Sequence, residues 1–89
     1  MGETAGRICS KLTAAFSPER LELVDDSARH AGHTGARPGG ESHFSVTIVA
    51  AAFEGLNRVD RQRRINTVLA EELAGPVHAL SIKALAPGE

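Results

Sequence analysis

The sequence predicts an α+β fold, a two-layer sandwich in which helices pack on one face of a three-stranded mixed sheet. Residues 44–48 alternate apolar and polar side chains, as a half-buried strand does. Apolar stripes at helical spacing precede and follow that strand. The expected order of elements along the chain is helix, strand, strand, helix, strand. Because 89 residues are too few for two independent cores, we expect one domain over residues 1–89.

The first helix is expected over residues 4–16. Ile8, Leu12 and Phe16 recur every four residues and form one apolar stripe. Pro18 ends this helix, because the residue before a proline avoids the α region. A short strand follows over residues 21–24, with Leu21 and Leu23 on one face.

The central strand is the strongest strand signal in the chain, with Phe44, Val46 and Ile48 on the same face. It follows a segment over residues 29–40 that is rich in glycine and histidine and too long for a tight hairpin. Loops of this length in compact domains are functional or disordered, so we expect a mobile surface loop there.

The second main helix is expected over residues 58–73, with Asn57 as its N-cap and Gly75-Pro76 as its end. Its core stripe is Ile65, Leu69 and Leu73, flanked by Val59, Val68 and Ala70. The third strand is expected over residues 77–84, with His78, Leu80 and Ile82 on one face. Because this strand returns through a helix, we expect it to lie parallel to a neighbour after a right-handed crossover.

Composition excludes several classes of function. A formal net charge of −1 gives no overall attraction to nucleic acid or to an anionic membrane. The chain lacks an apolar run long enough to span a membrane and an N-terminal apolar stretch typical of a signal peptide. Cys9 is the only cysteine, which suits a reducing compartment, so we expect a cytoplasmic protein.

Four histidines are the candidate metal ligands. His30 and His33 lie in the long loop, His43 opens the second strand, and His78 opens the third. A neutral imidazole binds borderline metals, and a swinging loop could bring His30 or His33 to His78. Two ligands are too few for a closed site, so a partner would have to complete it. The alternative is that the loop histidines are solvated and the others make ordinary hydrogen bonds.

The second helix carries four arginines that could contact phosphates. An ordinary solvated face is the alternative, because Asp60, Glu71 and Glu72 lie in the same region. The four arginines are Arg58, Arg61, Arg63 and Arg64.

An enzyme is not expected, since the sequence offers no nucleophile with a base and no carboxylate pair across a pocket.

Several short motifs, taken together and in order, are specific. They are LELVDDS at 21–27 followed by His30, ESHF at 41–44, FEG at 53–55, RQR at 61–63 and VHALSI at 77–82. This series resembles the BolA family, and the resemblance extends over about residues 7–84. The family often has Arg-His-Arg where this chain has Gln62 in the middle, which weakens any function of that position.

The resemblance implies a fold like the type II KH domain and a heterodimer with a monothiol glutaredoxin. Such a pair holds a bridged 2Fe-2S cluster, to which the glutaredoxin contributes a cysteine and bound glutathione. The positions of the family's histidine ligands fall on His78 and on His30, with His33 as a rival, while His43 is interpreted as structural. The isolated chain is expected to hold no cofactor and to be a monomer or a weak homodimer.

The resemblance also implies a second function from another class. BolA-like proteins have been proposed as DNA-binding transcriptional regulators of stress response and cell morphology, which would use the arginine-rich helix. A third interpretation is a module that binds zinc without a partner.

Overall fold

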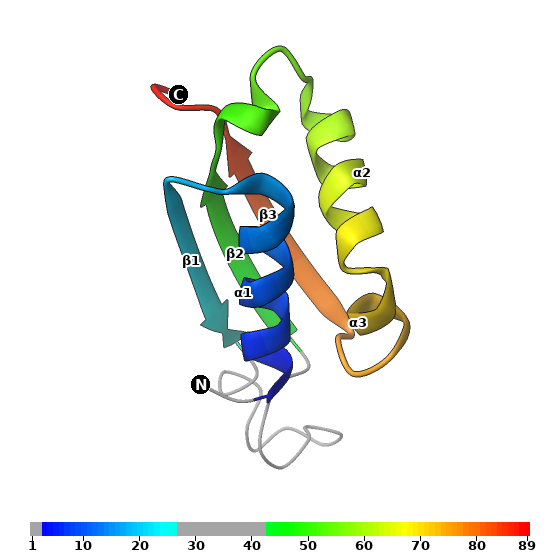
Figure 1. Cartoon of the computed structure of the whole chain (residues 1–89). Helices are drawn as coiled ribbons and strands as arrows, with labels where there is room; N and C mark the ends of the chain where they lie inside the picture. The colour runs from blue at the N-terminus through cyan, green and yellow to red at the C-terminus, as the bar shows by residue number, and fades with distance from the viewer. Residues whose placement is uncertain (1–2, 27–42) are drawn as a thin grey trace.

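The computed structural model describes residues 3–26 and 43–89. Its two layers are a sheet and a set of helices that lie on one face of that sheet (Figure 1). The elements within the described ranges are α1 Glu3–Phe16, β1 Arg20–Asp25, β2 His43–Val49, the short 3-10 helix η2 Ala51–Phe53, α2 Arg58–Val68, α3 Ala70–Ala74 and β3 Ala79–Leu85.

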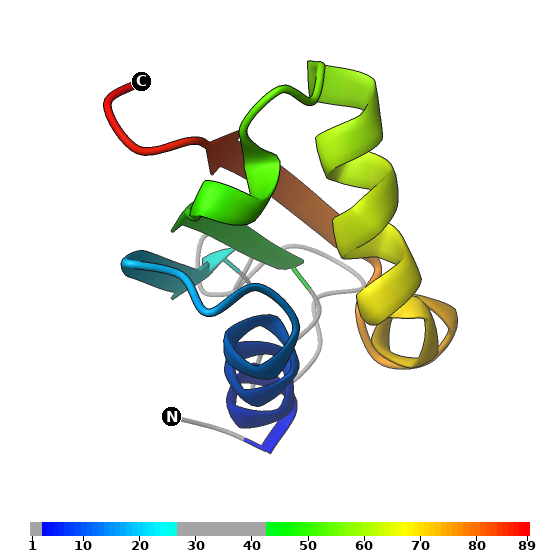
Figure 2. The same cartoon turned by 45° about the horizontal axis from the view of Figure 1, so that its top comes forward.

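The sheet has the order β1-β2-β3, with β1 antiparallel and β3 parallel to the central β2. This confirms the mixed three-stranded sheet and the parallel return of the last strand. Turning the molecule shows α1 and α2 on the same side of the sheet, and neither of these two helices lies on the other face (Figure 2). The chain therefore crosses from β2 to β3 through η2, α2 and α3 above one face.

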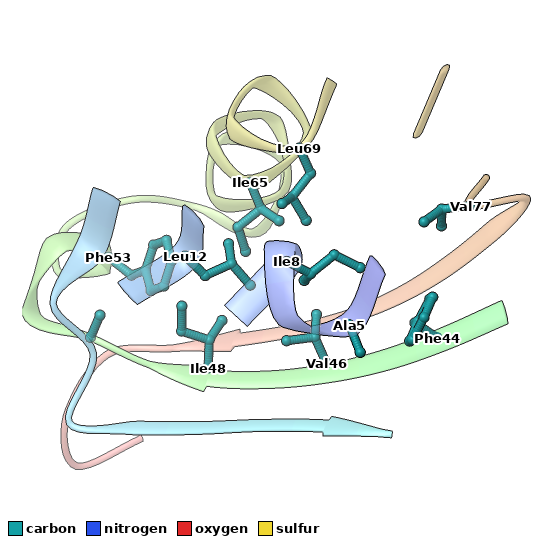
Figure 3. Packing of buried hydrophobic residues seen from close by; sticks show 11 residues of the cluster. Ala5, Ile8, Leu12, Phe44, Val46, Ile48, Phe53, Ile65, Leu69 and Val77 are labelled. Atoms are coloured by element: carbon teal, nitrogen blue, oxygen red, sulfur yellow. The ribbon is translucent and has the colours of Figure 1, made fainter. Parts of the chain in front are cut away.

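The core lies between these two layers (Figure 3). Phe44, Val46 and Ile48 of β2 are at most 2% exposed, which confirms the face that the alternation predicts. The helix stripes meet them, because Ile8 and Leu12 of α1 and Ile65 and Leu69 of the second helix region are also fully buried. Burial of these apolar side chains is the main stabilising term, at about 25 cal/mol per Å² of apolar surface.

The predicted helix over residues 58–73 is wrong in one respect, since Leu69 divides it into α2 and α3. The backbone of Leu69 has φ −101° and ψ 19°, although its N–H still donates to Ile65 and its C=O accepts from Leu73. The break is therefore a local distortion within a continuous path. Asn57 caps α2 as predicted, with its side-chain oxygen 2.8 Å from the N–H of Asp60.

Two residues assigned to the flanks of the core stripe lie outside the core. Val59 is 57% exposed and Ala70 is also exposed. With 100° of rotation per residue, Val59 lies about 120° around the helix from Ile65, so it faces solvent.

Among the described residues no helix is long and apolar enough to cross a membrane.

Glu72 joins α3 to α1 and is the single polar residue among the buried side chains of the described core. Its Oε1 accepts a hydrogen bond of 3.0 Å from Lys11 Nζ. Its Oε2 lies 3.0 Å from the same nitrogen and 3.1 Å from Arg7 Nη2, as ion pairs without good hydrogen-bond geometry. The buried carboxylate is therefore neutralised by two cations that reach solvent.

Candidate functional site

One end of the sheet collects the described histidines. The parallel register places His43, the first residue of β2, opposite Ala79, the first residue of β3. The antiparallel register places Asp25, the last residue of β1, opposite Phe44. The starts of β2 and β3 and the end of β1 therefore share one edge of the molecule (Figure 1).

His78 lies one residue before β3, whereas the strand predicted over residues 77–84 included it. Val77 is buried, at 3% exposed, and anchors the backbone immediately before the histidine, while His78 itself is exposed. The predicted alternation over residues 77–84 therefore starts only at Ala79. The result is an imidazole on a fixed backbone with its ring in solvent.

His43 is half-buried beside it. The two imidazole centroids are 6.4 Å apart, with an edge-on angle of 62°. Phe44 packs into the core, so the neighbouring His43 projects toward the face of the sheet opposite to α1 and α2. On that face Ser45 donates a hydrogen bond to Asp26, which ties the end of β1 to β2. The edge that carries His78 is thus held by side chains as well as by the strand ladder.

The described residues do not make a complete metal site. Within residues 3–26 and 43–89, no group of three or more His, Cys, Asp or Glu side chains could hold a metal ion. His78 offers an imidazole nitrogen, a ligand that iron and zinc accept. It fits a site that other ligands complete, and it does not fit a closed site made of described residues alone.

The other two candidate ligands, His30 and His33, lie outside the described residues. The segment that contains them begins after Asp26 and ends before His43. Both of these flanking residues belong to the edge that carries His78, because β1 ends there and β2 begins there. Convergence of a loop histidine with His78 stays a prediction.

The arginines of the second helix separate into two groups. Arg58, Arg63 and Arg64 are exposed. The side chain of Arg61 is only 12% exposed, and it donates from Nε to the carbonyl of Leu56 and from Nη1 to the carbonyl of Ala84. Arg61 is thus held within the fold, whereas contact of the exposed three with nucleic acid stays a prediction.

A family model described as BolA-like protein matches residues 12–89. The chain belongs to the BolA family. It is 48% identical over 89 residues to BolA-like protein 1 of Pongo abelii, an alignment that covers 100% of this chain and 62% of that protein. The chain therefore spans less than two thirds of the length of that BolA relative.

Two further similarities bear on fold and function. The solved structure described as the BolA domain of SufE1 from Arabidopsis thaliana has a TM-score of 0.86 and 42% identity, covering 98% of this chain and 95% of that one. The Escherichia coli protein named DNA-binding transcriptional regulator BolA is 47% identical over 76 residues, covering 85% of this chain and 69% of that protein. The α+β BolA fold is thus confirmed, and the family includes a regulator that binds DNA.

Sequence reasoning missed two interactions of this BolA domain. Arg61 pairs with Glu89, whose carboxylate accepts from Nη1 and from Nη2 at 2.9 Å. The hydrogen bond to Glu89 is the main cause that raises the pKa of Arg61. No sequence signal marks the pair of Arg61 and Glu89. The second missed interaction is that of the buried Glu72. Glu72 lies seven residues after Ile65, on the core stripe, and this spacing could have indicated its burial.

Cys9 is half-buried on α1, and burial raises the pKa of its thiol above the ordinary value of 9.0. A thiol with a raised pKa is protonated at neutral pH and is a poor nucleophile or metal ligand. Cys9 is therefore not a candidate ligand of this BolA domain.

Proposed function

We propose that the chain is a non-catalytic accessory protein of iron–sulfur cluster assembly, trafficking or regulation in the cytoplasm. It forms a heterodimer with a monothiol glutaredoxin and co-ligates a 2Fe-2S cluster through His78 and one histidine of the loop, His30 or His33. The observation that carries the proposal is the exposed imidazole of His78 at the edge where both ends of that loop meet the sheet.

The chemistry of such a half-site follows from its ligands. The glutaredoxin would supply its cysteine and bound glutathione as ligands, and His78 and a histidine of the segment before β2 would supply imidazole nitrogens. Replacing thiolates by neutral imidazoles removes negative charge from the cluster, and in Rieske centres this exchange raises the reduction potential. A ligand pair with one member on the anchored backbone just before β3 and one in the segment between β1 and β2 suits a cluster that is passed on.

The test uses visible circular dichroism of a cluster-loaded monothiol glutaredoxin, to which the chain is added in steps. The wild type is expected to change the spectrum with an endpoint of one chain per glutaredoxin, and His78→Ala is expected to abolish the change. His43→Ala is the matched control, because it removes a neighbouring imidazole that is interpreted as structural. A response of His78→Ala equal to that of the wild type would remove the proposal.

The loop ligand is identified in the same assay. His30→Ala and His33→Ala are compared singly, and the one that behaves like His78→Ala marks the ligand. Pulsed electron paramagnetic resonance of the reduced heterodimer counts the nitrogens bound to iron, and two are expected. A single bound nitrogen in the wild type would contradict a pair of histidine ligands from this chain.

A second candidate function is that of a DNA-binding regulator. The observation that favours it is the exposure of Arg58, Arg63 and Arg64 on α2, together with the name of the Escherichia coli relative. Duplex DNA is titrated at two salt concentrations, and affinity is expected to fall with salt and with Arg63→Ala. Arg20→Ala, an exposed arginine on β1, is the control. Equal losses from Arg20→Ala and Arg63→Ala would assign the binding to general charge.

A further inference from the structure

A groove of about 630 Å³ lies between α2 and the second half of β3. Its cationic side chains are Arg58, Arg61 and Lys83, and its apolar side chains include Leu56, Ile82 and Leu85. None of the described residues that line it is acidic. It lies toward the end of β3 opposite to His78, so occupation of one site leaves the other accessible.

Arg61 is organised in advance to bind a carboxylate. Its Nε donates to the carbonyl of Leu56 at 2.9 Å and its Nη1 to the carbonyl of Ala84 at 3.1 Å. These bonds fix the guanidinium plane between the start of α2 and the end of β3. A fixed guanidinium binds a planar acid through two parallel hydrogen bonds and loses little further rotamer freedom.

The carboxylate that fills this position belongs to the chain itself. Glu89 binds Arg61 through both of its oxygens, and its Oε1 also accepts from the N–H of Ala86 at 3.0 Å. The hydrogen bond to Arg61 is the main cause that lowers the pKa of Glu89 to about 2, so this carboxyl is ionised at neutral pH. Its side chain is 44% exposed and can therefore be displaced toward solvent.

We propose that this groove binds an acidic peptide segment of a partner protein, with a carboxylate of the partner replacing that of Glu89 on Arg61. Aliphatic side chains of the partner then cover Leu56, Ile82 and Leu85, and further acids meet Arg58 and Lys83. A peptide is favoured over a nucleic acid because none of the described residues that line the groove is aromatic and able to stack a base.

The experiment follows the Nε–Hε resonance of Arg61 by NMR in the full chain. The probe is an N-acetylated, C-amidated peptide with the sequence of residues 85–89, Leu-Ala-Pro-Gly-Glu. Glu89→Gln is expected to bind it saturably, and the wild type about tenfold more weakly, because its own glutamate competes at a high effective concentration. Glu54→Gln, which removes another exposed carboxylate, is expected to match the wild type.

Further arms separate the possible outcomes. Lys83→Gln in the Glu89→Gln chain is expected to weaken binding of the probe peptide. A probe peptide that ends in glutamine is expected not to bind. Lys83→Gln in the wild-type chain repeats the comparison without altering Arg61–Glu89, should Glu89→Gln disturb the amide spectrum. Equal binding by Glu89→Gln and wild type, or tighter binding of a single-stranded oligonucleotide at this resonance, would overturn the proposal.

Discussion

Replacing Lys11 with methionine should leave a charge stranded inside the protein. Glu72 is 1% exposed, and Lys11 supplies both its hydrogen bond at 3.0 Å and an ion pair at 3.0 Å. Methionine keeps most of the aliphatic stem of lysine, so the packing of α1 against α3 is largely retained. What the variant loses is the cation, and the carboxylate then has only Arg7 at 3.1 Å.

The loss of stability expected for Lys11→Met depends on how deeply the ion pair is buried. Removing one partner of a fully buried ion pair costs about 3–5 kcal/mol, because the other charge stays desolvated. Lys11 is 30% exposed and Arg7 remains, so we expect a smaller loss, of about 2 kcal/mol. At about 4–8 °C per kcal/mol for a domain of this size, the expected fall in Tm is about 8–16 °C.

Removing the carboxylate should cost less than removing the cation. In Glu72→Met the ammonium of Lys11 and the guanidinium of Arg7 reach solvent and keep Glu71, at 3.7 and 3.8 Å. No charge is then buried, so the expected loss is below about 1 kcal/mol. The double variant Lys11→Met/Glu72→Met should resemble Glu72→Met alone, which gives a coupling energy of about 2 kcal/mol, equal to the loss expected for Lys11→Met.

The assay is urea unfolding at neutral pH, with Arg20→Met as the control. Arg20 pairs with Glu22 on the surface, with the two side chains 61% and 55% exposed, and such pairs contribute about 0.5 kcal/mol or less. If Glu72→Met lost as much stability as Lys11→Met, the reasoning about the stranded carboxylate would be refuted.

The ion pairs of Glu72 with Lys11 and Arg7 also make the stability of the fold depend on pH. Burial is the largest influence on Glu72 and raises its pKa, but the hydrogen bond from Lys11 and the other favourable contacts outweigh burial and leave the pKa below its ordinary value of 4.5. Because the folded pKa is the lower one, the stabilisation is present above pH 4.5 and is lost as the pH falls through the folded value. Glu72→Met should lack this component of acid unfolding.

Three further predictions address the cap, a turn and the carboxylate on Arg61. Asn57→Ala should cost about 1 kcal/mol in urea unfolding, because the N–H of Asp60 loses its acceptor. Gly55→Ala should cost about 1–2 kcal/mol from backbone strain alone, since Gly55 has φ +79° and nothing lies within 4 Å of an added Cβ. The carboxyl of Glu89 should titrate at about pH 2 by carbon NMR and return toward 4.5 in Arg61→Gln; titration near 4.5 in the wild type would exclude the pair.

The central strand shows how far a sequence pattern determines this fold. Phe44, Val46 and Ile48 alternate with polar residues, and a slip of one residue would expose all three, so both the strand and its buried face are predictable. The parallel position of β3 is also predictable, because the chain returns through a helix. Local patterns succeed where one buried face imposes them.

The errors arise where packing between elements decides the outcome. The break at Leu69 has no glycine or proline to indicate it in the sequence, although the backbone of Leu69 leaves helical geometry there. Glu72 was grouped with solvated acids because its partners, Arg7 and Lys11, lie more than sixty residues away in the chain. Arg61 was grouped with exposed arginines because its acceptors come from β3 and from Glu89. Contacts at such separation leave no local pattern.

The candidate ligands illustrate the same limit and its one exception. Spacing alone leaves His43 and His78 unrelated, being 35 residues apart, yet the parallel register brings their rings to 6.4 Å. That register follows from the crossover, so the meeting of the two strand starts at one edge is a consequence of topology. The segment that carries His30 and His33 joins the end of β1 to the start of β2, and antiparallel pairing returns both junctions to that edge. The fold therefore places the backbone of His78 and both junctions of that segment at one end of the sheet, and the proposed pair of histidine ligands depends on this placement.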